Sequence, residues 1–348
     1  MDPAQIIRLR LQNQQLIDSV YKKPEDVVKW MGAVQAQDYA GCKWALGLRT
    51  INSTDKSIED AINKNKIFRT HVLRPTWHLV HPQDIRWMLM LTAPRVHAFC
   101  AFGYRKMKLT DTIFKKAHKV FAKALSGGKQ LTRTELAAEL HKAKIATDDL
   151  RMIHLLIHAE LEALICNGAK RDKQFTYALM DDCVPSTKSI TKEQALVKLA
   201  EGYFKSHGPA TIEDFNWWSG LTTKDAKRGL ENIKTSLLSE TIDGKTYWMT
   251  HETAASKIKP SIFLLPSFDE YTVSYKDRSL VVDTAASKKT GNGIFKPLVI
   301  ADGKAKGLWK RNDKKGQSRV LPTLFEKLNA TQTKMIATEI ERYTKFLG

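Results

Sequence analysis

One succession of hydrophobic and polar positions recurs along the chain: stretches with the 3.6-residue spacing of amphipathic helices, then alternation around a turn. It is clearest in residues 191–250. "TKEQALVKLAEGYFKSHG" opens with a capping-box pattern, and "PATIEDFNWWSG" and "LTTKDAKRGLENIK" predict two more helices. "LLSETIDGKTYWMT" then alternates around Asp243-Gly244, a strong hairpin signal. Three helices followed by a hairpin predict a winged helix, which is a helix-turn-helix carrying a β-wing.

The same order is predicted twice more upstream. In the middle of the chain, three segments are expected to be helices that precede a wing around Gly168: residues 112–128, 131–143 and 148–165. At the N-terminus, helices that open near Pro3 and Pro24 precede "IFRTHVLRPTWHLV", which alternates around Arg74-Pro75 as a wing hairpin would.

The last quarter of the chain breaks this order. "SIFLLPSFDEYTVSYKDRSLVV" and "GIFKPLVIADGKAKGLWKR" are β-rich, Asp302-Gly303 marks a second hairpin turn, and a final helix is expected at about residues 322–346. The predicted fold class is α+β, mainly α, with three tandem winged-helix modules and a C-terminal β-rich region. The expected boundaries are 1–110, 111–188 and 189–255 for the modules and 256–348 for the last region.

The net charge of the chain indicates the kind of partner that it binds. The chain has 56 Lys and Arg against 37 Asp and Glu, a net charge of +19, which favours a polyanionic partner. No apolar run approaches the length of a membrane span, and the N-terminus lacks the features of a signal peptide. The four cysteines lie far apart without a C-x-x-C, which predicts reduced, mostly buried thiols. A cytoplasmic, monomeric protein that binds nucleic acid is therefore expected.

Common hydrolase and cofactor motifs do not occur. His154 and His158 have i,i+4 spacing, but Leu155 stands where a zincin needs Glu, so helix packing explains the pair better. "GNG" at 291–293 is not followed by the rest of a dinucleotide fingerprint, and there is neither a P-loop nor a Gly-x-Ser-x-Gly elbow. Neither a metal ion nor an organic cofactor is expected.

Aromatic and basic clusters admit two interpretations each. Trp217 and Trp218 have faces on which bases can stack, although their place within a predicted helix favours core packing. Basic stretches are candidates for phosphate contacts or are simply solvated surface: residues 103–109, 169–173 and 308–319.

"VQAQDY" places two glutamines one residue apart. On an ideal helix Gln35 and Gln37 would point about 200° apart, whereas on an extended or turn segment they can point the same way. Gly32 and the capping potential of Asp38 place the pair between two helices, so convergence is feasible. Spacing alone leaves an alternative open, in which one glutamine caps a helix end and the other is solvated.

Four blocks resemble the winged-helix DNA glycosylases of the AlkZ type, in that family's order and over nearly the whole chain: "GAVQAQDYAGCKWALGLR", "VLRPTWHLVHPQDIRWML", "LLPSFDEYTVSYKDR" and "VIADGKAKGLWKR". The resemblance implies a C-shaped array of three winged helices around a channel for double-stranded DNA. It also implies excision of N7-alkylated purines and unhooking of guanine crosslinks. The family's catalytic motif, Gln-x-Gln, falls on Gln35, Ala36 and Gln37, whereas the sister branch of the YcaQ type has Asp at the second position. Ala36 is smaller than the residue expected between the glutamines, which leaves the preferred lesion open.

The chemistry agrees with this assignment. Alkylation at N7 makes guanine cationic, so the base can leave without receiving a proton. The protein then needs only to position a water molecule and to stabilise an oxocarbenium-like transition state. Our hypothesis is that the carbonyl oxygens of Gln35 and Gln37 do both, in a monofunctional DNA glycosylase.

Other residues of the blocks have looser assignments. Thr76 and His78 share one face of the strand "TWHLV" and are candidates for the pocket or for DNA, with a structural hydrogen bond as the alternative for His78. Asp269 and Glu270 are carboxylate rivals for activating water, and the alternative is a buried Asp tied to Arg278. Candidate phosphate contacts are Arg74, Lys310 and Arg311.

Two non-enzymatic functions remain open. A winged-helix regulator would prefer certain sequences and ignore lesions. A damage sensor would bind distorted duplex without excising a base.

Overall fold

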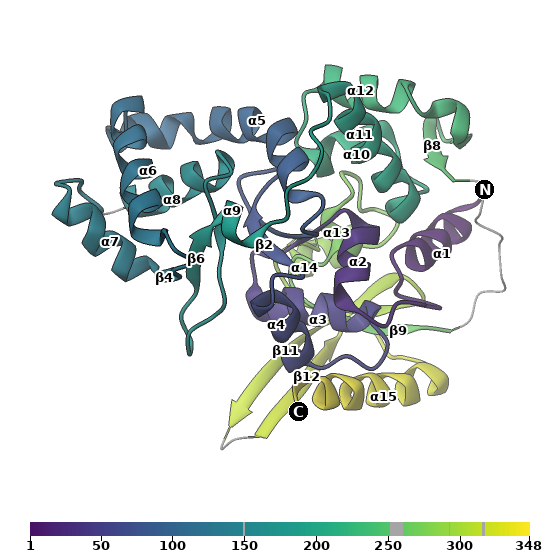
Figure 1. Cartoon of the computed structure of the whole chain (residues 1–348). Helices are drawn as coiled ribbons and strands as arrows, with labels where there is room; N and C mark the ends of the chain where they lie inside the picture. Colours follow the sequence, from purple (N-terminus) through teal and green to yellow (C-terminus); the bar gives the residue numbers. More distant parts are fainter. Residues whose placement is uncertain (149, 251–259, 292, 315–316) are drawn as a thin grey trace.

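The computed structural model describes residues 1–148, 150–250, 260–291, 293–314 and 317–348. The chain is α+β and mainly helical, as predicted, and the sheets within its described residues are small and antiparallel (Figure 1).

The N-terminal part combines helices with a three-stranded sheet of order β1-β3-β2. Three of its helices begin at the predicted signals, because Pro3 and Pro24 open α1 and α2 and Asp38 caps α3 with its side chain; Asp2 also caps α1, which was not predicted. The predicted hairpin around Arg74-Pro75 is formed by β2 and β3, whereas β1 was not predicted as a strand. The elements are α1 (Pro3–Asn13), α2 (Pro24–Met31), β1 (Ala33–Gln35), α3 (Tyr39–Arg49), α4 (Asp55–Asn63), β2 (Phe68–His71), β3 (Trp77–Val80) and α5 (Ile85–Lys106).

The middle of the chain has the predicted order of helices and strands, with a sheet of order β4-β6-β5. Thr132 caps α7 through the predicted box with Glu135. The elements are α6 (Asp111–Leu125), β4 (Leu131–Thr132), α7 (Arg133–Lys142), α8 (Arg151–Leu161), β5 (Ile165–Asn167), β6 (Thr176–Leu179) and α9 (Met180–Cys183).

The third set of elements follows the predicted order of three helices and a hairpin. Thr191, Thr211 and Thr222 are the N-caps of its helices, and Asp243 and Gly244 form the turn of its hairpin with positive φ angles. The elements are α10 (Lys192–His207), α11 (Ile212–Ser219), α12 (Thr223–Glu231), β7 (Leu238–Ile242) and β8 (Lys245–Met249).

The C-terminal region contains a four-stranded sheet of order β12-β11-β10-β9. Asp302 and Gly303 form the predicted turn between β10 and β11. The prediction of the last helix was wrong at its start, because residues up to Leu324 pair with β11 as a strand and the helix begins only after its Asn329 cap. The elements are β9 (Ile262–Leu265), α13 (Glu270–Val273), α14 (Thr284–Thr290), β10 (Leu298–Ala301), β11 (Lys304–Lys314), β12 (Gln317–Leu324) and α15 (Ala330–Leu347).

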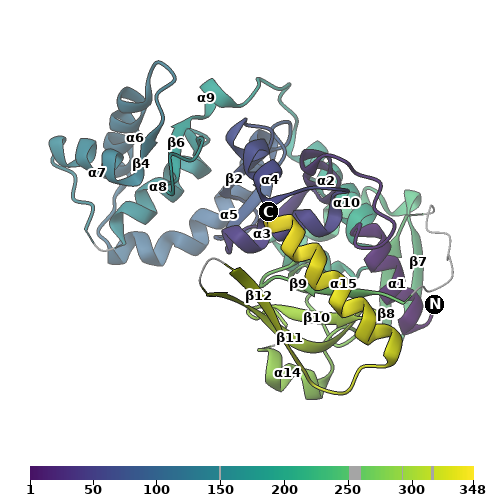
Figure 2. The same ribbon diagram turned by 90° about the horizontal axis from the view of Figure 1, so that it is seen from below.

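Among the described residues, three hydrophobic cores hold these parts together. One is shared by the N-terminal helices, the C-terminal sheet and α15, a second by β2, α5 and α10–α12, and the third lies within α6–α8. Figure 2 accordingly shows α6–α8 at one end of the molecule, connected through α5 to the rest. The first and third parts of the chain are in close contact at Gly220, where a Cβ would lie 2.2 Å from the carbonyl oxygen of Leu73.

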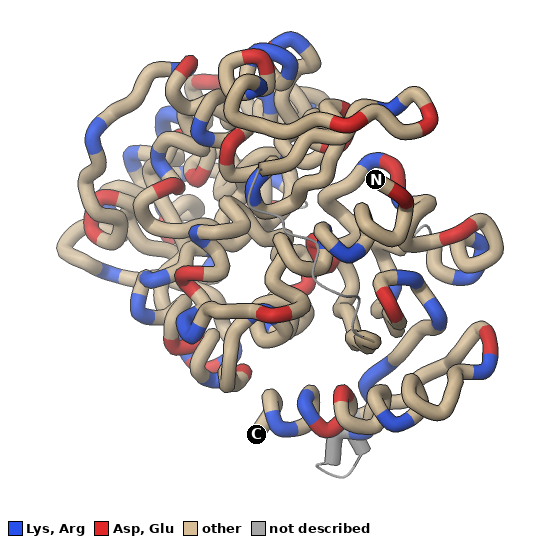
Figure 3. Tube along the Cα trace, turned by 90° about the vertical axis from the view of Figure 1, so that its right-hand side faces the viewer, with Lys and Arg blue, Asp and Glu red and all other residues tan. Residues whose placement is uncertain are grey.

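Several sequence expectations can be placed on this fold. The boundaries after residues 110 and 188 fall between α5 and α6 and between α9 and α10, while that after 255 lies outside the described residues. Among the residues described, no helix combines the length and apolarity needed to cross a membrane. All four cysteines are free thiols, and three of them are buried. Lys and Arg positions are spread over the chain and mixed with acidic ones (Figure 3).

Candidate active site

The two glutamines lie in a short connection that is held at both ends. Gln35 is the last residue of β1 and is paired with His78 on β3. The next residue, Ala36, donates its N–H to the carbonyl of Trp77 at 2.7 Å. Asp38 then caps α3 by accepting from the N–H of Gly41 at 3.0 Å. The segment is therefore extended, the conformation in which glutamines two apart can act together.

Gln35 and Gln37 have different surroundings. Gln35 is only 6% exposed, and its side-chain oxygen Oε1 accepts from the backbone N–H of Gln37 at 2.6 Å. The side chain of Gln37 is exposed. The buried Gln35 side chain thus fixes the backbone of Gln37, whose own side chain is exposed. The spacing of the two glutamines did not predict this hydrogen bond.

Glu270 anchors Gln35 from the other side. Its Oε1 accepts from the backbone N–H of Gln35 at 2.7 Å, and its Oε2 accepts from the indole N–H of Trp218 at 3.1 Å. His207 Nε2 lies 3.5 Å from the same Oε2. Glu270 is buried with both oxygens engaged, so it fixes the end of β1 rather than facing solvent as a base for water.

A row of buried polar side chains crosses the first sheet beside Gln35. His78 pairs with Gln35 on one side and with Thr70 on the other, and directly opposed residues share a face of the sheet. The His78 side chain is fully buried, with Nδ1 3.0 Å from the carbonyl oxygen of Thr76. Burial, and then the charge of Arg74, lower the pKa of His78 well below its usual range, so this imidazole is neutral. His78 therefore lies inside the protein behind Gln35, not on an exposed DNA-facing surface.

Arg74 and Thr76 lie in the β2–β3 hairpin and also point inward. The Oγ1 atom of Thr76 and two guanidinium nitrogens of Arg74 are buried and have no hydrogen-bond partner among the described residues. Burial lowers the pKa of Arg74, and the Glu270 carboxylate opposes that shift. Arg74 is half-buried: its Cγ would lie 3.1 Å from a Cβ at Gly220 at the end of α11, and its Nε and Nη2 atoms are buried, which makes it a poorer phosphate contact than a fully exposed side chain.

Asp269 is a structural residue, but its partner is not the predicted Arg278. Its two carboxylate oxygens accept from Nη2 and Nη1 of Arg49 at 2.8 and 2.9 Å, and both side chains are fully buried. Arg278 instead donates to the carbonyl of Thr272 at 2.8 Å. Arg49 ends α3 and is remote in sequence, so only the packing of α3 on the C-terminal region could pair it with Asp269.

Two of the predicted basic stretches lie on surface hairpins. Lys310 and Arg311 are exposed on β11, which projects with β12 from the body of the molecule (Figure 1). In the stretch 169–173, Lys170 is paired with Glu59 at 3.1 Å and Arg171 with Glu135. Of the four side chains, Lys310 on β11 is the simplest one with which to test a phosphate contact, because it is exposed.

A small aromatic pocket adjoins the glutamine segment and was missed from the sequence. Its walls include Tyr39, Trp77 and Phe175, and its volume is about 60 Å³. The Arg69 guanidinium lies 4.1 Å from the Trp77 ring centre and donates to the carbonyl of Ala36 at 3.1 Å, and Lys170 Nζ lies 5.3 Å from the Tyr39 ring. The aromatic faces already contact two cations, so a cationic base would be repelled there.

Trp217 and Trp218 are not equivalent. Trp218 is fully buried, as core packing predicted, while Trp217 is 41% exposed and donates its indole N–H to the carbonyl of Val273 at 2.9 Å. The ring of Trp217 also faces the Arg278 guanidinium, which lies 5.3 Å from its centre.

A comparison with known protein families shows which family the chain belongs to. The family model described as "DNA glycosylase AlkZ-like" matches residues 28–346, a span that includes the glutamine segment, the first sheet and the C-terminal sheet. The chain belongs to this family. It is therefore a DNA glycosylase, as the four blocks predicted.

Individual relatives agree with the family assignment. This glycosylase is 24% identical over 322 residues to the "Interstrand DNA cross-link repair glycosylase" of Streptomyces sahachiroi, covering 88% of this chain and 86% of that protein. Its fold is similar to the solved structure of the Streptomyces sahachiroi DNA glycosylase AlkZ, with a TM-score of 0.80 and 22% identity over 99% of this chain and 97% of that one. The fold is thus the AlkZ fold over nearly its full length.

Proposed function

We propose that the protein excises cationic N7-alkylated purines from double-stranded DNA, with Gln35 and Gln37 as its catalytic glutamines. One observation carries this proposal: an exposed amide side chain, Gln37, stands on a backbone fixed by a buried one, Gln35. The carboxylate of Glu270 is already occupied by Gln35 and Trp218, and that of Asp38, next to Gln37, accepts from the N–H of Gly41 as the cap of α3. Neutral amides are therefore the groups available at the surface of the site.

The reaction suits such a site. Water attacks the anomeric carbon as the bond to N9 breaks, and the bonding electrons neutralise the positive ring of the leaving base, so no strong acid is required. The Gln37 carbonyl can accept a hydrogen bond from the attacking water. The second lone pair of Gln35 Oε1 can accept another, because its first already accepts from Gln37 N–H. A neutral amide also avoids binding the cationic lesion too tightly in the ground state.

Unhooking of interstrand crosslinks is proposed as a second substrate class. The named relative repairs interstrand crosslinks, and the exposure of Gln37 at the surface suits a bulky lesion that cannot enter a deep pocket.

The first experiment compares three duplexes of one sequence that carry N7-methylguanine, hypoxanthine or no lesion. We expect release of free N7-methylguanine, measured by mass spectrometry because hot alkali cleaves at this lesion by itself, and no release from the other two duplexes. A duplex joined through guanine N7 atoms should yield separated strands on a denaturing gel. Tight binding without release would indicate a sensor, and sequence preference indifferent to lesions would indicate a regulator.

Lys310→Ala should weaken DNA binding without changing lesion preference. An exposed lysine that contacts one phosphate releases about one counterion, so the slope of log affinity against log salt should fall by about 1. Fluorescence anisotropy at several salt concentrations measures this slope. Lys345→Ala, which removes an equally exposed charge from α15, is the matched control, and equal slopes for the two variants would remove Lys310 from the DNA interface.

A further inference from the structure

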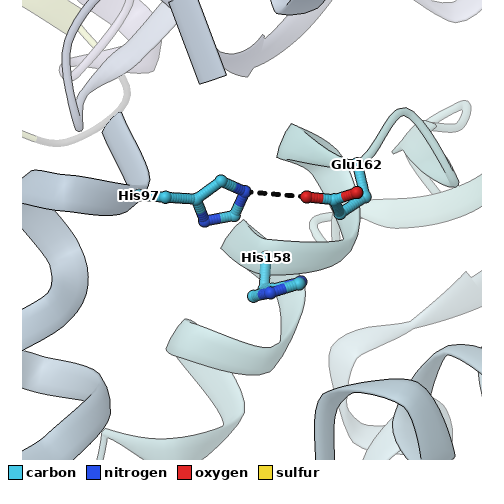
Figure 4. Close-up of side chains that lie close together, drawn as sticks. All are labelled: His97, His158 and Glu162. Carbon is cyan, nitrogen blue, oxygen red and sulfur yellow. Dashed lines mark hydrogen bonds and ion pairs between the residues drawn. The ribbon is translucent and has the colours of Figure 1, made fainter. Parts of the chain in front are cut away.

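A cluster of histidines lies where α5, α6 and α8 meet, apart from the candidate active site. His97 comes from α5, His118 from α6 and His158 from α8, and Glu162 follows the end of α8 (Figure 4). His97 Nε2 is 3.0 Å from Glu162 Oε1, and His158 Nδ1 is 3.1 Å from His118 Nε2. The His158 ring stacks on Phe114 with 3.7 Å between ring centres.

Three of these side chains have the spacing of metal ligands. One ligand atom each from His97, His158 and Glu162 lies within 4.8 Å of the other two. Zn²⁺ binds imidazole nitrogen and carboxylate oxygen at about 2.0–2.2 Å, so a tetrahedral ion holds its donors roughly 3.4 Å apart. The His97–Glu162 pair is already within that separation, and His158 lies beside this pair on α8, with a ligand atom within 4.8 Å of both (Figure 4).

Neighbouring side chains orient both imidazoles toward this point. His97 Nδ1 is 3.1 Å from Tyr104 Oη, which leaves Nε2 facing Glu162. His158 Nδ1 faces His118, which leaves its Nε2 as the donor. Hydrogen bonding at the second nitrogen is the usual way in which proteins orient metal-binding histidines. The exposed fractions of His97 and Glu162, 22% and 52%, give an ion access from solvent.

We propose that His97, His158 and Glu162 bind a divalent transition-metal ion, best matched by Zn²⁺, that clamps α8 to α5. Two imidazoles and one carboxylate suit Zn²⁺, whereas Mg²⁺ and Ca²⁺ prefer oxygen ligands alone. The ion would stabilise the packing of α8 on α5, the helix that connects α6–α8 to the rest of the molecule. This differs from the sequence expectation of no metal, which considered His158 only with His154. In the fold, His158 instead lies beside His97 of α5 and Glu162 at the end of α8.

Titration of Zn²⁺ into the full-length, EDTA-dialysed protein, followed by calorimetry, tests the proposal. We expect one saturable site per chain. His97→Gln and Glu162→Gln should each weaken it by about tenfold or more, since even the loss of an outer partner costs that much. His141→Gln, at an exposed histidine of α7, is the matched control and should bind as the wild type does. Mg²⁺ should not compete.

Thermal unfolding supplies a second measurement. Zn²⁺ should raise the unfolding midpoint of the wild type and of His141→Gln, reversibly with EDTA, because a ligand that binds only the folded state stabilises it. At the same Zn²⁺ concentration the midpoint of Glu162→Gln should rise less, in line with the weaker binding of that variant. Glu162 is half exposed, so its variant should keep the wild-type circular dichroism spectrum. Absence of a saturable site, or unchanged binding in His97→Gln and Glu162→Gln, would overturn the proposal. These outcomes are independent of base excision.

Discussion

Gln37→Ala is expected to slow the excision of N7-methylguanine by about 10²-fold or more, the usual effect of removing a positioned catalytic group. The structure gives a reason to expect little change in stability, because the side chain of Gln37 is exposed. Duplex affinity should therefore persist while the single-turnover rate falls. Rapid quench of enzyme in excess over lesion duplex measures that rate.

Gln35→Ala should cause a comparable loss by a different route. It removes the oxygen that holds the Gln37 N–H at 2.6 Å as well as a potential acceptor for water. Gln83→Ala, at an exposed glutamine just before α5, is the matched control and should retain the wild-type rate. Full activity in both Gln35→Ala and Gln37→Ala would refute the two-glutamine mechanism, even if the protein proved to be a glycosylase.

Asp269→Asn is expected to lower the free energy of unfolding by about 3–5 kcal/mol, the range for removing one partner of a buried ion pair. The bidentate pair with Arg49 is fully buried, so the amide would leave the guanidinium charge without compensation. Asp269 also accepts from the N–H of Tyr271 at 2.9 Å at the start of α13. Urea unfolding, followed by circular dichroism and by tryptophan fluorescence, measures the loss.

A surface pair supplies the comparison. Glu139→Gln makes the same chemical change in the exposed pair of Glu139 with Lys142, where about 0–1 kcal/mol is expected. If Asp269→Asn cost no more than Glu139→Gln, the buried pair would not be holding α3 to the C-terminal region. Excision should fall as well in Asp269→Asn, because the adjacent Glu270 holds the backbone of Gln35.

Much of the local structure could be predicted because its causes are local. The caps at Thr132, Thr191 and Thr211 and the turns at Asp243-Gly244 and Asp302-Gly303 depend on side chains that bond to their own neighbours or tolerate positive φ. The last helix was placed too early because β12 forms only through its pairing with β11, a partner that local propensity does not reveal.

The candidate site could be predicted in part. Gln35 and Gln37 were found by a motif, and their extended conformation by flanking helix signals. The difference between them could not be predicted, since the burial of Gln35 results from Glu270 and Trp218, which approach it from remote segments. The same limit explains the wrong partner for Asp269: Arg278 is near in sequence, whereas Arg49 is near in space.

The order of the residues was thus sufficient for most element types, the basic charge and the family, because these depend on local patterns and composition, while the catalytic role of the two glutamines stays a prediction. Tertiary packing was needed to make β1 a strand, to bury His78, to pair Arg49 with Asp269 and to gather His97, His158 and Glu162. Burial and long-range pairing depend on which distant segments share a core, and a single sequence records these segments without recording their contacts.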